Sequence, residues 1–527
     1  MAKVDEFAGV KLPRSPVYGT KYMVVSGHSL ASIAGMRAFE RGGSVADALI
    51  ATSAVLCVVL PQATSLGGDA FIILHDAKKG RTEGLNASGP APAGATPDKF
   101  PNGMLAHGPL AASVPGIVRG WERLHAGRGK LEWASLFADA IELAENGHPL
   151  SRVLANGLNI FPQVATDPAL KALYMPGGVA LKPGTILKQP ALAKALRAIA
   201  RDGSKAYYEG WIGKSIGDYS QANGGLLSAK DFAGYEPEWV EPLATDYRGL
   251  TVRVMPPNSF GILMLMQLNA ISGVPAGVLT GPDADRLACL IAAARAAFPE
   301  GTRYICDPRV HPAPVDELLG GQMTGKLQAA VRAAAPGMAM AHPPGGTSCI
   351  TLMDGDGNGA AVVQSVFHVF GSSFMDPGTG ILLNNRMTGF TTDPGHRNVV
   401  APGKRPAHTL NPVMVFDKGR IRYLMTTPGG PAQTISNVQM LTNMVDRGLE
   451  LSAAIEAPRW TIDGKGEAYI DDAFPDDVAK ALAARGHKVS RASGASYFGS
   501  SKCIEVLANG VLSGAADHRR EAYAVGR

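Results

Sequence analysis

Thr347 is the residue whose type and setting most readily suggest chemistry. It begins a run of strand-forming residues directly after a glycine- and proline-rich stretch at 336–346. Cleavage of the chain in front of Thr347 would expose an α-amine with a pKa of about 7.7–8, low enough for the amine to take the proton of the neighbouring hydroxyl near neutral pH. One residue would then supply both nucleophile and base. The alternative is that a β-branched threonine simply begins a strand.

Other arrangements that support catalysis or ligand binding are missing from the sequence. No G-x-S-x-G motif lies between a strand and a helix, so nucleophile-elbow serine chemistry is not indicated. The glycine pairs at 67–68 and 429–430 match neither the phosphate-loop nor the dinucleotide fingerprint, and the 12 histidines show no metal-ligand spacing. Residues 354–359 resemble the start of a calcium loop, but Ser365 stands where that loop needs a bidentate glutamate. We therefore expect no cofactor and no metal ion.

Turn residues and hydrophobic runs predict the elements that would position Thr347. Residues 349–353 and 360–365 are strand-like runs joined by the turn-rich 354–359, so Thr347 is expected at the start of a β-hairpin. Ser44 is a suitable N-cap for a helix at 46–60. Further strands are expected at 23–26, 71–75, 412–416 and 423–427, and further helices at 434–446 and 476–486. Strands interspersed with helices predict a layered α/β domain.

Composition narrows the classes of protein and of partner. The chain has 527 residues, of which 46% are hydrophobic and 18% charged, a balance typical of a soluble globular protein. The net charge of +5 comes without a block of lysine and arginine, so we expect a small-molecule partner and no nucleic acid. The best apolar run, 48–60, is shorter than the ~20 residues of a membrane span, and the N-terminus carries no secretory pattern. Five widely spaced cysteines favour a reducing compartment, so we expect a cytoplasmic protein without membrane contact.

Motifs along nearly the whole chain resemble the γ-glutamyltransferase family. Those similar to the family's small subunit are 346–354, 380–385, Lys404-Arg405-Pro406, Asn411-Pro412 and Pro428-Gly429-Gly430. Those similar to its large subunit are 23–27, 42–48, Gly67-Gly68-Asp69 and Ser113-Val114-Pro115-Gly116. The resemblance implies an N-terminal-nucleophile hydrolase with a four-layer αββα sandwich.

The same resemblance implies a precursor that cuts itself between Gly346 and Thr347. Residues 1–346 would form a large fragment and 347–527 a small one, and the two together would make one interleaved domain. Two copies of this two-fragment protein could also form a dimer, and the sequence leaves that question open. Thr347 Oγ would attack an amide carbonyl while its own amine, directly or through water, moves the proton, giving an acyl-enzyme that meets water or an amine.

Three more residues acquire roles from the family pattern. Gly429 and Gly430 match the oxyanion-hole glycines, where a side chain would obstruct the approach of the backbone N–H groups; a plain turn is the alternative. Ser365 stands where the family usually has a second threonine whose hydroxyl helps orient the nucleophile. The alternative for Ser365 is a serine that merely ends a strand.

The substrate pocket departs from the family's γ-glutamyl pattern. Ser88 stands at the place of the arginine that binds the glutamyl α-carboxylate, and Gly389 at the place of the acidic residue that binds the α-amine. His408 and Thr409 replace a serine pair, and Phe367 replaces an asparagine. Both charged contacts to a γ-glutamyl group are therefore missing at the expected positions.

These changes look more like the oxamate amidohydrolase branch, whose substrate is a small amide bearing a carboxylate. That branch commonly has an arginine where Pro90 stands, and we hypothesise that Arg386 supplies the carboxylate contact instead. A surface or structural salt bridge is the alternative for Arg386. The other residues expected at the substrate are Asn385, His408, Thr409 and Asn411.

Three functions stay open at this point. The leading expectation is a self-processing threonine amidohydrolase that cleaves a small, carboxylate-bearing, oxamate-like amide through an acyl-enzyme. The second is a γ-glutamyl transferase or hydrolase, or a cephalosporin-type acylase, with a modified pocket. The third is an uncleaved, non-catalytic binding protein.

Overall fold

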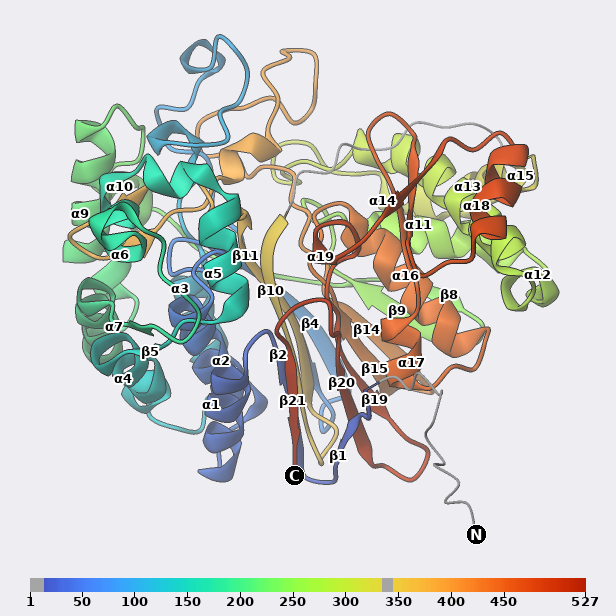
Figure 1. Ribbon diagram of the computed structural model, residues 1–527, viewed down its shortest axis with the longest axis horizontal. Coiled ribbons are helices and arrows are strands. Elements are labelled where there is room, and N and C mark those ends of the chain that lie inside the picture. The colour runs from blue at the N-terminus through green and yellow to red at the C-terminus, as the bar shows by residue number, and fades with distance from the viewer. Residues whose placement is uncertain (1–13, 334–344) are drawn as a thin grey trace.

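Two seven-stranded sheets lie face to face between two layers of helices in the computed structural model, which describes residues 14–333 and 345–527 (Figure 1). Sheet I has the order β21 (Tyr523–Gly526), β2 (Tyr22–Ser26), β10 (Gly345–Asp354), β11 (Gly359–His368), β3 (Asp69–Asp76), β4 (Arg81–Ala87), β7 (Glu238–Val240). Sheet II has the order β1 (Val17–Gly19), β20 (Leu512–Ala516), β19 (Lys502–Val506), β15 (Arg420–Thr426), β14 (Val413–Asp417), β9 (Leu250–Val254), β8 (Leu243–Tyr247). This is the αββα sandwich implied by the resemblance.

The centre of sheet I is the hairpin predicted around 354–359. Strands β10 and β11 pair antiparallel, and their neighbours β2 and β3 come from the N-terminal part of the chain. A cut before Thr347 would therefore leave sheet I built from strands of both fragments. The glycine- and proline-rich stretch predicted before Thr347 lies outside the described residues except for its last two glycines.

One helical layer covers the outer face of sheet I. Its innermost helix, α2 (Val45–Val59), matches the predicted helix at 46–60, and a capping box between Ser44 and Asp47 fixes its first turn. All of its residues are buried, because it packs between sheet I and the surrounding helices α1 (Ser29–Glu40) and α4 (Ala138–Asn146). A helix that is apolar all round is expected in such a place.

The second helical layer covers sheet II. It includes α11 (Gly261–Ser272), α13 (Asp283–Thr302), α16 (Ala432–Val445) and α18 (Asp476–Ala484), seen to the right of the sheets in Figure 1. The helices α16 and α18 and the strands β14 and β15 confirm the elements expected from the sequence there. In the described part of the chain, no helix combines the length and apolarity needed to cross a membrane.

An apolar core fills the space between the two sheets. Cys349 and Met353 of β10 and Val363 of β11 belong to this core. Because side chains alternate along a strand, Thr347 faces the same inter-sheet space at the end of β10. The fold therefore presents the Thr347 side chain where the apolar core gives way to polar groups.

Candidate active site

The Thr347 hydroxyl lies 3.0 Å from the hydroxyl of Ser365, its direct partner across β10 and β11. Both residues are buried. Ser365 Oγ donates to the carbonyl oxygen of Gly346 at 2.5 Å and accepts the N–H of Phe367 at 2.7 Å. Since a hydroxyl has one proton, Thr347 must be the donor to Ser365. The serine thus bridges the Thr347 hydroxyl and the carbonyl of the bond expected to be cut.

Gly346 sits at a register irregularity, where the pairing of β10 with β11 shifts between Gly346 and Thr347. A Cβ atom at Gly346 would lie 2.5 Å from the carbonyl oxygen of His368 and 2.6 Å from that of Gln62. Both obstacles are backbone atoms, so no side chain fits without moving the strand. The bulge and the missing side chain together present the Gly346 carbonyl to Thr347 and Ser365.

Ser365→Ala is expected to slow self-cleavage by roughly 10²–10³-fold, because the scissile carbonyl loses a hydroxyl donor at the oxygen where charge develops. A time course of the intact chain on denaturing gels measures the rate. Ser365→Thr, which keeps the hydroxyl, should restore most of it. Cleavage of the alanine variant at the native rate would remove Ser365 from the account.

A buried charge cluster lies on the same face of sheet I as Ser365. Asp69, which begins β3, is the direct neighbour of Ser365 across β11 and β3. Its Oδ2 lies 3.1 Å from Nε2 of His408 and 3.5 Å from Nε of Arg386, and its Oδ1 accepts the N–H of Gly89 at 3.1 Å. Asp69, His408 and Arg386 are all fully buried. Arg386 is therefore not a surface residue, and it shares a salt bridge with Asp69.

The Arg386 guanidinium is poorly satisfied by the protein around it. It begins a short 3-10 helix (Arg386–Gly389), and its Cζ lies 4.1 Å from the centre of the Phe367 ring. Within the described residues none of its three nitrogens makes a hydrogen bond of good geometry. Phe367 reaches this place with φ at +80°, a strained conformation for an aromatic residue. Arg386 is thus a buried cation that packs on an aromatic ring, and the N–H groups of its guanidinium are unused as donors.

Burial dominates the protonation states in the cluster. It raises the pKa of Asp69 to about 6, although Arg386 acts in the opposite direction. Burial lowers the pKa of Arg386 to about 10. Burial and the nearby positive charge of Arg386 together lower the pKa of His408 well below its usual range. His408 is therefore a neutral imidazole near pH 7, and Asp69 changes charge in the range where enzymes are assayed.

Gly429 and Gly430 lie between β15 and α16, at the beginning of that helix. Their φ angles of +134° and +58° fall in the region that glycine tolerates best. Neither N–H donates to an acceptor among the described residues. Both groups are therefore free to bind an anion, as an oxyanion hole requires. No hydrogen bond in the described ranges joins either glycine to Thr347, so the role stays a prediction.

The remaining predicted substrate residues fall into two groups. Asn385 is engaged: its Oδ1 accepts the N–H of His368, and its Nδ2 donates to the carbonyl oxygen of Ala106. Thr409 Oγ1 and Asn411 Oδ1 are buried and find no hydrogen-bond partner within the described part of the chain. The latter two oxygens are unpaired, whereas Asn385 would have to give up an existing bond to contact a ligand.

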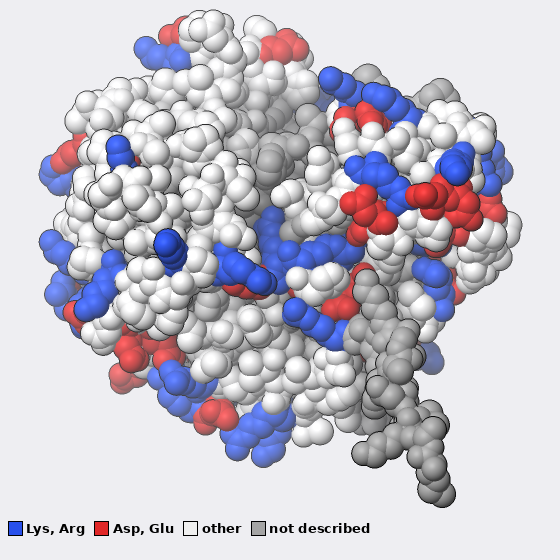
Figure 2. Space-filling model, viewed as in Figure 1, with Lys and Arg blue, Asp and Glu red and all other residues white. Residues whose placement is uncertain are grey.

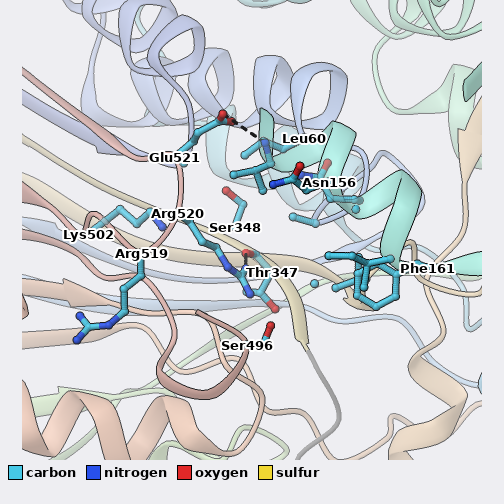
Figure 3. Close-up of a pocket in the computed structure, with 18 residues that line it drawn as sticks. Leu60, Asn156, Phe161, Thr347, Ser348, Ser496, Lys502, Arg519, Arg520 and Glu521 are labelled. Carbon is cyan, nitrogen blue, oxygen red and sulfur yellow. Dashed lines mark hydrogen bonds between the residues drawn. The ribbon is translucent and has the colours of Figure 1, made fainter. Parts of the chain in front are cut away.

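A pocket of about 260 Å³ opens beside Thr347 (Figure 3). Gly346, Thr347 and Ser348 line it on one side, and residues in and next to α5 (Arg152–Ile160) line it on another. The sequence did not predict its charged residues, which are Lys502, Arg519, Arg520 and Glu521. They stand in the C-terminal part of the chain and carry no local motif, so only the folded chain brings them to the nucleophile. Asp69 was part of a predicted motif but was given no role.

An αββα sandwich with a threonine at the start of a central strand, beside a bond presented for cleavage, defines an N-terminal-nucleophile hydrolase. The gamma-glutamyltranspeptidase family model matches residues 31–526, and the chain belongs to this family. It is accordingly an enzyme of the amidohydrolase or transpeptidase type.

Three comparisons show how closely the chain follows its relatives. It is 34% identical to the glutathione hydrolase-like YwrD proenzyme of Bacillus subtilis, over 97% of this chain and 99% of the relative. It is 30% identical to the oxamate amidohydrolase proenzyme of Klebsiella pneumoniae, over 96% of this chain and 98% of the relative. The solved cephalosporin acylase of Bacillus halodurans superposes with a TM-score of 0.92 at 31% identity, covering 98% of each chain.

Proposed function

We propose that the chain is a self-processing threonine amidohydrolase whose substrate is a small amide bearing a carboxylate. The observation that supports the substrate class is the Arg386 guanidinium, which is fully buried on the Ser365 face and has unused donors. Burying a cation costs free energy, which Asp69 at 3.5 Å and the Phe367 ring offset only in part. A substrate carboxylate would bind the guanidinium in a bidentate manner.

Self-cleavage begins with the hydroxyl of Thr347. Its oxygen bonds to the carbonyl carbon of Gly346, the bond from that carbon to the Thr347 nitrogen breaks, and the hydroxyl proton ends on the nitrogen. Ser365 donates to the Gly346 oxygen as negative charge develops there. Water then hydrolyses the resulting ester, which yields the Gly346 carboxylate and restores the Thr347 hydroxyl beside a free amine.

Turnover repeats this chemistry on a separate amide. The Thr347 amine accepts the hydroxyl proton while the oxygen attacks the substrate carbonyl, and the proton passes to the departing amine. Gly429 and Gly430 supply N–H groups to the oxyanion, and Arg386 holds the carboxylate of the acyl part. Water attacks the acyl-enzyme, releases the acid and regenerates the threonine.

Two assays on the purified protein test this proposal together. Denaturing electrophoresis reports self-cleavage, and ammonia release from oxamate is compared with turnover of γ-glutamyl-p-nitroanilide. Two fragments and preferential hydrolysis of oxamate support the amidohydrolase. Preferential turnover of the γ-glutamyl compound would assign the chain to γ-glutamyl transfer or hydrolysis instead. A single band near 54.9 kDa without either activity would support a non-catalytic binding protein.

A cephalosporin-type acylase is the second candidate. It is favoured by the TM-score of 0.92 with the cephalosporin acylase and by a pocket that has room for more than a primary amide. Faster hydrolysis of a cephalosporin amide than of oxamate would select it.

The binding of a carboxylate substrate is expected to weaken as the pH rises from about 5 to about 7. Asp69, whose pKa lies at about 6, is neutral at the lower pH and charged at the higher, where it competes with the substrate for Arg386. The ratio of KM for oxamate to KM for uncharged oxamide should therefore rise several-fold. Asp69→Asn should abolish the rise. A flat ratio in the native enzyme, or an unchanged rise in the variant, contradicts the competition.

We also propose a cytoplasmic location. All five cysteines are buried and unpaired, as expected for a chain that folds under reducing conditions. Immunoblotting of separated cytoplasmic and exported fractions tests the location.

A further inference from the structure

We propose that Gln433 is a positioning residue for turnover, because its side chain, together with that of Asn437, holds the turn of Gly429 and Gly430 against the backbone of Asn411. The inference rests on the proposed function, in which the two glycines supply N–H groups to the oxyanion. It assigns Asn411, expected from the sequence at the substrate, to the support of the oxyanion hole instead.

The turn of the two glycines is continuous with the first turn of helix α16. The N–H of Ala432 donates to the carbonyl oxygen of Gly429, and the N–H of Gln433 donates to that of Gly430, each at 3.1 Å. A peptide unit is planar, so the carbonyl of Gly429 and the N–H of Gly430 turn together. The direction of the Gly430 N–H therefore depends on where the first turn of α16 is held.

Two amide side chains on one face of α16 hold this helix to the segment that precedes β14. Gln433 and Asn437 are four residues apart, so they lie one above the other on the helix. Oε1 of Gln433 accepts the N–H of Asn411 at 3.0 Å, and Nδ2 of Asn437 donates to the carbonyl oxygen of Asn411 at 3.4 Å. The three residues form an amide clamp, in which α16 binds both backbone groups of Asn411.

The amide clamp is uncharged, and its three residues are fully buried. It differs in this from the lysine and arginine side chains that gather around the central hollow of the face shown in Figure 2. Hydrogen bonds in a buried place are stronger than bonds at the surface, where water competes for the same groups. The two bonds to Asn411 can therefore restrict the movement of α16.

Stability alone does not account for polar side chains at this place. Nε2 of Gln433 and the Oδ1 atoms of Asn411 and Asn437 make no hydrogen bond within the described part of the chain. Buried atoms of this kind cost free energy unless a water molecule bridges them. Apolar side chains of similar volume would avoid that cost. The amides are thus better explained by the bonds with which they position α16.

The segment held by the clamp also carries a residue of the buried charge cluster. His408 lies in this segment and contacts Asp69. Between His408 and Asn411, the carbonyl oxygen of Leu410 accepts the hydroxyl of Ser259 at 2.7 Å, which fixes the segment from its other side. One fixed segment therefore relates the position of the oxyanion hole to that of the acyl site.

Gln433→Leu removes the acceptor of the Asn411 N–H and keeps much of the side-chain volume. We expect kcat to fall by roughly 10–100-fold and KM to stay within about twofold, because a displaced donor stabilises the oxyanion less and leaves substrate binding unchanged. Self-cleavage, in which Ser365 donates to the scissile carbonyl, should keep its native rate. The substrate is whichever of oxamate, γ-glutamyl-p-nitroanilide or a cephalosporin amide the native enzyme turns over.

Two further variants separate positioning from a general structural role. Burial raises the pKa of a carboxyl, so the side chain introduced by Gln433→Glu is neutral and still accepts the Asn411 N–H, and kcat should stay within about threefold of the native value. Gln439→Leu is the matched control on the same helix, because Gln439 Oε1 accepts the N–H of Trp460 at 3.0 Å and its Nε2 donates to the carbonyl oxygen of Trp460 at 2.9 Å. It should lower Tm more than Gln433→Leu does and leave kcat unchanged.

Hydrogen exchange of the backbone amides in 427–433 tests the clamp without turnover. We expect exchange to be at least roughly tenfold faster in Gln433→Leu than in the native protein, and unchanged in Gln439→Leu. Unchanged exchange in Gln433→Leu, or an equal loss of kcat in Gln439→Leu, overturns the positioning role. Faster exchange with an unchanged kcat would support the clamp and contradict the oxyanion role that the proposed function gives to Gly429 and Gly430.

Discussion

Thr347→Ala is expected to leave the protein as a single chain of 54.9 kDa without amidase activity. The variant lacks the oxygen that attacks Gly346, so neither the ester nor the free amine can form. Because the free amine is also the base of turnover, one substitution removes both functions. We expect activity to fall by at least roughly 10³-fold. The comparison is made on denaturing gels and in the ammonia-release assay.

Thr347→Ser provides the matched control for this experiment. Serine keeps the hydroxyl that faces Ser365 at 3.0 Å and loses only the methyl group. It should therefore still cleave and still turn over substrate, at a reduced rate. An alanine variant that splits into two fragments at the native position would show that another residue is the nucleophile.

Arg386→Met is expected to raise KM for oxamate by roughly 10–100-fold and to change KM for oxamide much less. The expected size is that of a charged hydrogen bond, about 1.5–3 kcal/mol, lost from the carboxylate alone. Methionine keeps most of the volume over the Phe367 ring, so the packing contact survives in part. Steady-state kinetics with both substrates measures the difference.

The stability of the Arg386 variant needs its own control. Without the cation, Asp69 would be a buried charge with less compensation, but its pKa of about 6 already lies close to neutrality, and the group can protonate. Arg386→Met in an Asp69→Asn background removes the charge altogether. The exposed Arg420→Met tests for a general effect of losing an arginine. An equal change of KM for oxamate and oxamide would place the carboxylate site elsewhere.

Local patterns were sufficient to predict much of the scaffold. The β10–β11 hairpin follows from turn residues between two strand-like runs, and α2 follows from an N-cap and an apolar run. Both signals lie within a few residues, where propensity and capping act. The four-layer arrangement came from the family resemblance, because the order of strands in a sheet depends on contacts between distant segments.

The contacts of the site were harder to predict for the same reason. The sequence indicated Thr347 and Ser365, which are linked through one hairpin, but not the pairing of Asp69 with Arg386 and His408. Those three residues come from separate segments and meet only in the folded chain. Lys502 and Arg520 carry no motif at all, and their proximity to Thr347 appears only once β19 and the C-terminal segment are placed.

N-terminal sequencing of the smaller fragment tests the central claim most directly. The purified protein is incubated, separated on a denaturing gel and sequenced from the smaller band. We predict two bands and a sequence beginning Thr-Ser-Cys-Ile-Thr, which starts at Thr347. A chain that stays whole, or a fragment that begins at any other residue, would contradict the assignment of Thr347 as the nucleophile released by self-cleavage.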